Sequence, residues 1–460
     1  MNRRSLLIAV ATILSLAGSL AIRAAGESFE TATEAVANMR IGWNLGNTLE
    51  SNSGDTLNMW IEHWTDRTPT AYETAWGQPV ATRELIQMMK RAGFNAVRVP
   101  VTWYPHMEAR FQFSGYDNSL WLPSQDPLGT QIQTDWMQRV HEVVDYVISQ
   151  DMYCILNVHH DTGAASTAWL VADEGVYAQQ KERFEAVWTQ IANEFRDYDE
   201  HLLFEGYNEM LDTPRSWCFA SYAAPGQYNA AIARSAYNAI NSYAQSFVDA
   251  VRATGGNNAQ RNLIVSTYGA CSGSGTWNSH LQDPLKQMKL PTDEATGHLI
   301  FEIHSYLDVK NLTSAKNEVS QMLRDAKANL ASKGAPVIFG EWGSTTEDAY
   351  DKYRSNLLAF ARYFVEQTKA YGMGTFYWMG LSDGAHRSVP EFNQADLKDA
   401  IVKGWYGEEG YTGLRTVGAD ADRQPAVRYD LSGRRLPARD ATGRPAIVIV
   451  DGRKVVSRRK

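Results

Sequence analysis

Two glutamates at the ends of predicted strands are the residues best suited to catalysis. Glu209 closes the run LLFEGYNE (202–209), and Glu341 lies near the end of the short apolar run PVIFGEWG (336–343). Paired carboxyl groups can divide acid and base work, because one can hold a proton while the other stays ionised. Either acid alone could be a solvated strand-end residue or half of an ion pair. The residues that accompany the pair favour catalysis.

Polar or aromatic side chains also mark the ends of other predicted strands. They are Arg98, His159, His160, Asn208, His304, Tyr306 and Trp378. Side chains alternate along a strand, so His159 should share its face with Asn157 while His160 points the other way. The same rule places Glu205, Tyr207 and Glu209 on one face. It also groups the alternate residues from Glu302 to Tyr306. Only a barrel interior explains such polar rows.

The chain alternates strand-like runs with helix-like stretches, which predicts a parallel sheet. The eight runs lie at 41–45, 94–100, 153–160, 202–209, 262–269, 299–306, 336–343 and 374–379. The helix candidates lie at 80–91, 135–149, 179–196, 228–253, 315–331 and 348–370. Eight parallel strands close a (β/α)8 TIM barrel, an α/β fold whose active site forms at the carboxyl ends of the strands. An open doubly wound sheet is the alternative, although no phosphate-cradling glycine motif supports it.

The composition argues for a large folded core and against a nucleic-acid partner. The 460 residues are 44% hydrophobic and carry a net charge of -8. The charge is uneven, because residues 411–460 hold 12 Lys and Arg against 5 Asp and Glu. The body that precedes this basic tail is therefore strongly acidic, which disfavours phosphate backbones. The 14 Trp and 22 Tyr residues offer flat faces that suit sugar rings as well as packing.

The N-terminus has the layout of a secretory signal peptide. Arg3 and Arg4 precede an apolar run from Leu6 to about Ala21, and small residues follow. The run is short for a membrane span, and Ser, Thr and Gly interrupt it. We therefore expect residues 1–25 to be removed. The mature protein should be secreted to the periplasm, the cell surface or the medium, with no remaining membrane span.

The order of motifs resembles glycoside hydrolase family 5 of clan A, the cellulase family. The motifs are GWNLGNTLE (42–50), AWGQP (75–79), FNAVRVPVTW (94–103), ILNVHHD (155–161), FEGYNE (204–209), FEIHSY (301–306), VIFGEWG (337–343) and FYWMG (376–380). The resemblance covers about residues 36–406. It implies a barrel that cleaves β-linked polysaccharides with retention and without a cofactor, with Glu209 as general acid/base and Glu341 as nucleophile.

The other strand-end residues can be given roles in that reaction. Arg98 and Tyr306 would donate hydrogen bonds that hold Glu341 as an anion. Asn208 would bind the sugar 2-hydroxyl, and both His159 and His304 would orient sugar hydroxyls or the acid.

Further residues should form the substrate-binding cleft. Trp378 would floor the cleavage subsite, and His160 would contact substrate. Asn47 and Glu50 match family positions that hold the sugar two sites from the cut on the non-reducing side, with Trp76 nearby. Long loops at 48–79 and 101–127 carry further aromatic residues that suit an extended glycan cleft.

The sequence leaves the substrate and the reaction class partly open. The resemblance indicates an endo-β-1,4-glucanase, but cellulose, mixed-linkage glucan, xyloglucan and mannan all suit the same catalytic set. A metal-dependent hydrolase that uses residues 159–161 and His304 is an alternative of another class. A non-catalytic glycan-binding barrel is a third, although it would be expected to lack one of the two glutamates. The sequence pattern does not indicate an oligomeric state.

The end of the chain departs from the barrel pattern. We assign residues 26–412 to the catalytic domain and 413–460 to a basic tail with two β-like runs, 428–436 and 445–456. The tail resembles a divergent or truncated sorting domain, and a flexible tail is the alternative. Cys218 and Cys271 both follow predicted strand ends, so a disulfide between them is an open question.

Overall fold

The computed structural model describes residues 28–107, 129–223, 226–421, 428–429, 446–450 and 453–457. Eight parallel strands form a closed barrel in the order β1 to β8. The strands are β1 (Gly42–Asn44), β2 (Ala96–Val99), β3 (Tyr153–Asn157), β4 (Leu202–Glu205), β5 (Leu263–Cys271), β6 (Leu299–Leu307), β7 (Val337–Ser344) and β8 (Gly374–Tyr377). Each lies within or overlaps a predicted run, which confirms the TIM barrel.

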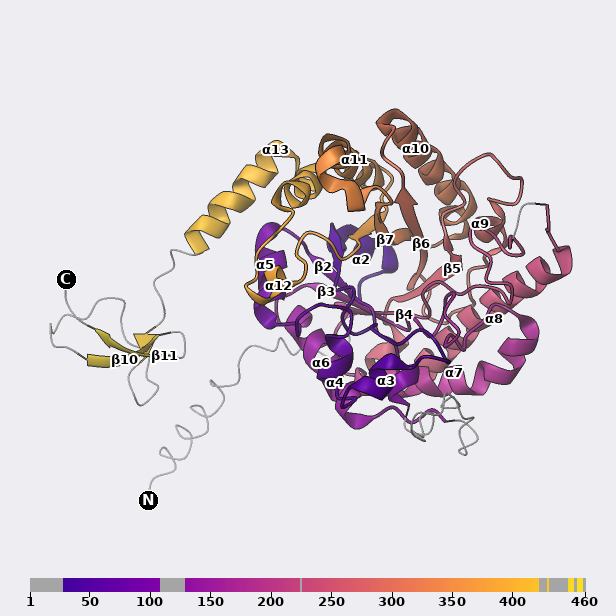
Figure 1. Ribbon diagram of the computed structural model, residues 1–460, viewed down its shortest axis with the longest axis horizontal. Coiled ribbons are helices and arrows are strands. Elements are labelled where there is room, and N and C mark those ends of the chain that lie inside the picture. The colour runs from indigo at the N-terminus through magenta and orange to yellow at the C-terminus, as the bar shows by residue number, and fades with distance from the viewer. Residues whose placement is uncertain are drawn as a thin grey trace, which may run out of the picture.

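Helices surround the strands (Figure 1). The long ones are α5 (Arg83–Ala92), α6 (Thr134–Ile148), α7 (Glu174–Glu194), α8 (Ala230–Ala253), α10 (Leu312–Asn329), α11 (Tyr350–Ala370) and α13 (Ala395–Ala421). Short helices lie in the connections, namely α3 (Trp60–Trp64), α4 (Pro69–Glu73), α9 (Asp283–Gln287) and α12 (Ala385–Ser388). Apolar stripes on the long helices bury against the outer faces of the strands, which fixes the barrel.

The lower part of the barrel interior is an apolar layer. Its side chains are Ala96, Ile155, Leu203, Ile264, Ile300, Ile338 and Phe376, and all are buried. Helix α2 (Ala32–Met39), which we did not predict, closes this end with four buried residues. Gly42 leaves room for Phe376, since a Cβ there would lie 2.1 Å from the ring. The barrel is thus a packed core and not a pore.

A polar layer lies directly above the apolar one. It consists of Asn44, Arg98, Asn157, Glu205, Ser266 and Glu302, all fully buried and each two residues beyond an inward-facing residue of the layer below. The alternation of side chains along the strands therefore turns a polar set toward the strand ends. The predicted polar row from Glu302 to Tyr306 is confirmed, because its alternate side chains all reach this centre.

The predicted row on β4 is wrong at Tyr207. The strand ends at Glu205, and the Tyr207 hydroxyl donates outward to backbone carbonyl oxygens of Ile240 on α8 and of Ser266. Asn208 instead turns inward and accepts from Arg98 at 2.8 Å. The period of two holds only while the chain stays in the ladder, and it changes here at Gly206.

A helix and a small sheet are described in the C-terminal part of the chain. Helix α13 has a non-helical residue, Gly407, close to the point where the barrel pattern stops in the sequence. The two predicted β-like runs contain β9 (Arg428–Tyr429), β10 (Ala446–Val450) and β11 (Arg453–Ser457), which form one antiparallel sheet.

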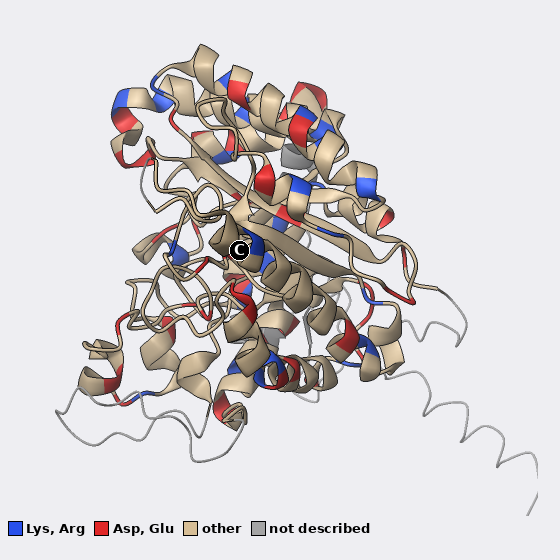
Figure 2. Cartoon of the chain, turned by 90° about the vertical axis from the view of Figure 1, so that its right-hand side faces the viewer, with Lys and Arg blue, Asp and Glu red and all other residues tan. Residues whose placement is uncertain are grey.

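Acidic and basic residues are interspersed along the outer helices (Figure 2). No described helix is long and apolar enough to cross a membrane.

Candidate active site

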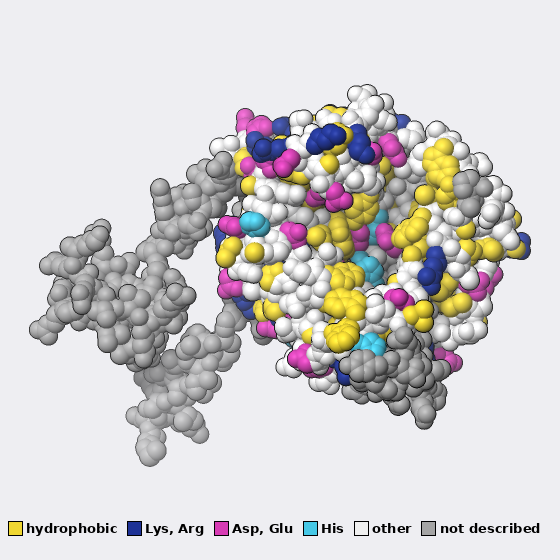
Figure 3. Space-filling view, viewed as in Figure 1, with side chains coloured by type: hydrophobic (Ala, Val, Ile, Leu, Met, Phe, Trp, Pro, Cys, Tyr) yellow, Lys and Arg dark blue, Asp and Glu magenta, His cyan; other side chains and the backbone are white. Residues whose placement is uncertain are grey.

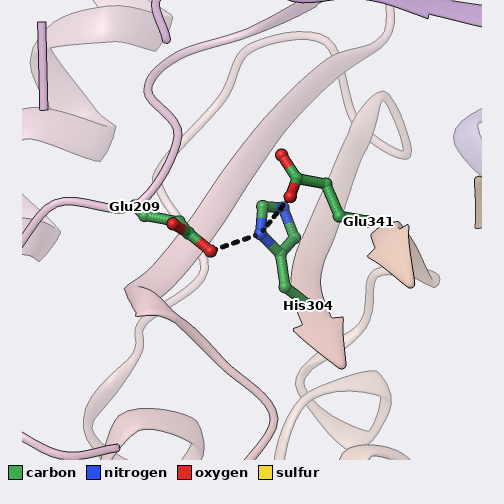
Figure 4. A group of neighbouring side chains, drawn as sticks. All are labelled: Glu209, His304 and Glu341. Atoms are coloured by element: carbon green, nitrogen blue, oxygen red, sulfur yellow. Dashed lines mark hydrogen bonds and ion pairs between the residues drawn. The ribbon is translucent and has the colours of Figure 1, made fainter. Parts of the chain in front are cut away.

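The two predicted glutamates meet at the carboxyl end of the barrel. Glu209 lies four residues beyond β4, Glu341 lies in β7, and His304 of β6 stands between them (Figure 4). One oxygen of each carboxylate and one ring nitrogen of His304 all lie within 4.8 Å of one another. Carboxyl groups about 5 to 5.5 Å apart suit displacement through a covalent intermediate, whereas direct attack by water needs about 6.5 Å or more. The spacing of Glu209 and Glu341 fits displacement through a covalent intermediate.

Hydrogen-bond donors surround Glu341. Arg98 Nη1 donates to Oε1 at 2.8 Å, and the Tyr306 hydroxyl donates to Oε2 at 2.6 Å. His159 Nε2 lies 3.7 Å from Oε1. Both oxygens thus receive donors, which favours the carboxylate over the protonated acid. The predicted contacts of Arg98 and Tyr306 with Glu341 are confirmed.

Arg98 is buried and binds three carboxylate and amide groups besides Glu341. It binds both oxygens of Glu205 at 2.6 and 2.7 Å and donates to Asn208 Oδ1 at 2.8 Å and Asn44 Oδ1 at 3.0 Å. The planar guanidinium suits such bidentate contacts. Glu205 and Asn44 were not predicted as site residues. Their signal in the sequence is a polar residue in the middle of an apolar strand.

Glu209 has the environment of a proton donor. Burial raises its pKa, and the neighbouring Glu341 acts in the same direction, whereas the hydrogen bond and the charge of His304 oppose the shift. The net pKa is above the ordinary value, so the group keeps its proton to higher pH. Its side chain is 23% exposed, which leaves it open to the cleft.

His159 is a neutral ring with a defined tautomer. Burial lowers its pKa well below the ordinary value, and nearby His160, Arg98 and His304 add to the shift. Asn157 accepts from the backbone N–H of Val101, so its amide nitrogen faces His159 Nδ1 at 2.9 Å. Nδ1 therefore accepts, which leaves the ring proton on Nε2 facing Glu341.

Aromatic rings lie on one side of this centre. Trp378 stacks on His159 with ring centroids 5.8 Å apart, and Trp76 lies against His160 at 5.4 Å. In Figure 3, histidine and acidic side chains lie in a hollow near the middle of the molecule, with hydrophobic side chains around it. Trp378, which we predicted as the floor of the cleavage subsite, and Trp76 thus lie near the catalytic pair.

Glu50 is buried and bound by its own loop. Its carboxylate accepts from the backbone N–H groups of Asn47 and Thr48, and burial raises its pKa to about 7. These contacts show how Glu50 shapes the loop that presents Asn47. Their predicted contact with sugar stays a prediction. The aromatic residues predicted between 108 and 127 lie outside the described residues.

A hollow of about 380 Å³ has Glu209 in its lining, together with Trp217, Trp277, His304 and Tyr306, among others. Trp217 is 44% exposed and Trp277 is 58% exposed. Sequence reasoning missed both tryptophans, although each follows a predicted strand end on a loop.

The geometry disfavours the metal alternative. Among the described residues, one group could surround an ion, and it is Glu209, His304 and Glu341. Its acidic neighbours raise the pKa of His304 to about 10 despite burial, so a metal would have to displace a strongly held proton from the ring. Asp161 accepts from the Trp103 backbone and the Trp169 ring nitrogen, which gives it a role in the loops.

All three cysteines are free thiols. Cys154 is buried in β3. Cys218 and Cys271 line the same hollow next to Glu209 and influence each other electrostatically, but they are not bonded.

The chain is similar to known proteins in sequence and in structure. The sequence model of the family Cellulase (glycosyl hydrolase family 5) matches residues 62–383. Endoglucanase A of Clostridium longisporum is 29% identical over 88% of this chain and 73% of its own length. Endoglucanase B of Neocallimastix patriciarum is 31% identical over 80% of this chain and 69% of its own.

Two solved structures are also similar. A GH5-4 broad specificity endoglucanase from an uncultured bacterium is 49% identical, with a TM-score of 0.75 over 84% of this chain and 98% of the other. A family 5 enzyme of Prevotella bryantii, solved with a xyloglucan tetradecasaccharide, is 37% identical, with a TM-score of 0.68 over 82% of this chain and 99% of the other.

Proposed function

Because this chain belongs to glycoside hydrolase family 5 and is an endoglucanase-like enzyme, we propose that it is a secreted endo-β-1,4-glucanase with Glu209 as acid/base and Glu341 as nucleophile. The observation that carries the assignment of roles is the pair of contrasting environments. Glu341 receives donors on both oxygens, whereas Glu209 has a raised pKa. The donors thus favour the anion at Glu341 and burial favours the protonated acid at Glu209, which are the two forms that double displacement requires.

The first step forms a covalent glycosyl-enzyme. A Glu341 oxygen attacks the anomeric carbon while Glu209 gives its proton to the departing glycosidic oxygen. Asn208, which is held by Arg98, would bind the sugar 2-hydroxyl. His304 lies 2.9 Å from Glu209 and compensates the negative charge that develops there.

The second step returns both acids to their first state. Glu209, now a carboxylate, takes a proton from a water molecule. The water oxygen attacks the anomeric carbon from the face that the leaving group left. The bond to Glu341 breaks, and the product keeps the original β configuration. Trp378, parallel to the His159 ring, would carry the sugar at the cleavage site.

Residues suited to binding sugar lie on both sides of the pair, which supports internal cleavage. Trp76, Asn47 and Glu50 would bind the non-reducing part of the chain. The hollow beyond Glu209 would bind the leaving part, with Trp217 and Trp277 as stacking surfaces. An enzyme that holds glycan on both sides cuts within a chain.

Loss of the Trp277 ring should therefore raise KM for long oligosaccharides. Trp277→Ala should act on an aryl cellobioside with nearly unchanged kcat/KM, because that substrate places no sugar beyond Glu209. The control is Trp405→Phe on α13. Equal effects of Trp277→Ala on both substrates would contradict the proposed position of the leaving group.

The substrate class is best tested with a panel of defined polysaccharides. The relatives include a broad specificity endoglucanase and an enzyme solved with a xyloglucan oligosaccharide, so we expect cleavage of cellulose-type and mixed-linkage glucans with xyloglucan as an additional substrate. Product profiles on these glucans and on mannan decide the matter. Mannan cleavage without glucan cleavage would refute the proposal.

Secretion and the domain limits rest on the sequence alone. Residues 1–25 have the layout of a signal peptide, and residues 413–460 form the proposed basic tail. N-terminal sequencing of the protein recovered outside the cytoplasm tests the first point. A mature protein that still begins at Met1 would refute it.

A further inference from the structure

His304 is placed among carboxylates on both sides of its ring. Nδ1 lies 2.9 Å from Glu209 Oε1 and 3.5 Å from Glu341 Oε2, as Figure 4 shows. Nε2 points the other way and lies 3.5 Å from Oε1 of Glu302, two residues back on the same strand. In the described part of the chain, neither Nε2 nor that Glu302 oxygen has a hydrogen-bond partner. The ion-pair contact between them at 3.5 Å is therefore the polar contact that Nε2 makes.

The structure makes room for the Glu302 carboxylate at this point. Its Oε2 accepts from the Ser266 hydroxyl, and Arg98 Nε lies 3.4 Å from Oε1. Gly340 of β7 lies directly against it, since a Cβ at Gly340 would be 1.5 Å from Glu302 Oε1. Any other residue at position 340 would displace the acid. The side chain of Glu302 is fully buried, so a satisfied ionic partner is required.

A neutral imidazole does not fit between these groups. It carries one N–H and one bare lone pair, and the lone pair would lie 3.5 Å from an anionic carboxylate on either side, Glu302 at Nε2 or Glu341 at Nδ1. A ring with a proton on Nε2 satisfies Glu302. The second proton then lies on Nδ1, which is 2.9 Å from Glu209 Oε1.

We propose that Glu302 is a positioning residue that holds a proton on His304 Nε2, keeps the ring cationic and so aims the Nδ1 proton at Glu209. Glu302 does not touch the substrate and acts through His304 alone. In the first catalytic step Glu209 loses its proton to the leaving oxygen, and the cationic ring stabilises the carboxylate that forms. In the second step Glu209 regains a proton from water while the ring stays charged. The proposal rests on Glu209 being the acid/base.

The charges that face the His304 ring agree with this role. Glu209 beyond β4, Glu341 on β7 and Glu302 on β6 are acidic and favour the cation, whereas the neutral His159 adds no charge. Burial opposes ionisation of Glu302 itself, but Arg98, His304 and the Ser266 hydroxyl lower its pKa below the ordinary value. Glu302 thus stays an anion under the ring.

The decisive measurement is the protonation of His304 by nitrogen NMR of histidine-labelled protein, with the signal assigned from the His304→Asn variant. In the wild type both ring nitrogens should remain protonated throughout the neutral range. Glu302→Gln keeps the shape and removes the charge, so the titration midpoint should fall by about 1 to 3 pH units. Ser266→Ala is the matched control, because it removes a hydrogen bond to Glu302 and leaves the charge. Its midpoint should stay near the wild-type value.

A second measurement separates positioning from general stability. Glu302→Gln should lose about tenfold or more in kcat/KM on cello-oligosaccharides, as part of the contribution of general acid catalysis. It should change little on dinitrophenyl cellobioside, whose leaving group needs no proton. Equal losses on both substrates would overturn the proposal.

The NMR outcome is independent of the catalytic assignment. A His304 ring that is neutral at pH 7 in the wild type would overturn the role of Glu302. Equal titration midpoints in the wild type and in Glu302→Gln would also overturn it. The wild-type measurement tests the proposal even if Glu302→Gln does not fold. A charged wild-type ring together with equal losses of Glu209→Ala on cello-oligosaccharides and on dinitrophenyl cellobioside would instead refute Glu209 as the acid.

Discussion

Alanine variants of the two catalytic glutamates should form azide products of opposite configuration. In Glu341→Ala the nucleophile is gone, and the wild-type partners Arg98 Nη1 and Tyr306 Oη, 2.8 and 2.6 Å from its oxygens, are left facing the hole. No other described carboxylate reaches this face of the site, so we expect a loss of about 10⁴-fold or more in kcat, or about 5.4 kcal/mol of barrier. The two exposed donors form a site for a small anion. Azide bound there attacks an activated β-glycoside and gives the inverted α-glycosyl azide.

The Glu209→Ala variant keeps its nucleophile and loses only the proton donor. Cleavage of unactivated glycans should fall by about 10² to 10⁴-fold, the usual contribution of general acid catalysis. Dinitrophenyl cellobioside should still form the glycosyl-enzyme, because dinitrophenolate leaves without a proton. Azide then attacks from the side that Glu209 vacated, next to His304, and gives the retained β-glycosyl azide.

The assay is proton NMR of the glycosyl azide formed by each variant from dinitrophenyl cellobioside. The coupling constant of the anomeric proton distinguishes the two configurations directly. Circular dichroism and thermal unfolding of both variants control for loss of fold. Formation of the inverted azide by Glu209→Ala, or near-native turnover by Glu341→Ala, would refute the assignment of roles.

Three further predictions follow from the same structure. Since burial and the Glu341 charge raise the pKa of Glu209, activity on glucans should fall as the pH rises through that pKa, and the alkaline limb should be absent with dinitrophenyl cellobioside. Titration of the denatured, unreduced protein should detect three thiols, and a single thiol would instead show that Cys218 and Cys271 pair. A chain that ends near Gly413 should keep full specific activity on soluble glucan, and a large loss would show that the tail packs on the barrel.

The barrel and the catalytic pair could be predicted because they depend on local patterns. Each strand is a short run of apolar residues that ends in a polar one, and the closure of eight such strands brings their carboxyl ends together. Glu209 and Glu341 are 132 positions apart in the sequence, yet strand ends in one barrel must share one face. The contacts of Arg98 and Tyr306 with Glu341 follow from the same rule.

The contacts within the buried polar layer could not be predicted in the same way. Alternation placed Glu205 and Glu302 inside the barrel, but it does not say which of several inward groups each will meet. That choice depends on the stagger of neighbouring strands. Arg98 binds both oxygens of Glu205, whereas Oε1 of Glu302 lies between Arg98 Nε at 3.4 Å and His304 Nε2 at 3.5 Å. Glu205 therefore fixes Arg98, and Glu302 pairs with His304.

Both catalytic glutamates follow a glycine at which the period of two changes. On β7 the pairing with β6 passes from Phe339 opposite Ile303 to Glu341 opposite His304, so Gly340 is an extra residue in the ladder. Without this bulge Glu341 would point outward, where Trp342 now packs against Phe364 of α11.

Beyond β4 the change occurs at Gly206, where a Cβ would lie 2.8 Å from Phe247 of α8. Tyr207 consequently turns outward, and Asn208 turns inward beside Glu209. Glycine inside a predicted strand commonly marks such a break, and it is the one sequence signal that would have corrected the predicted row. At Gly340 the absent side chain has a second use, because it admits the Glu302 carboxylate under His304. The residue that turns the nucleophile inward thus also makes room for the acid that keeps the neighbouring histidine charged, so a side chain at position 340 should disturb Glu341 and Glu209 together.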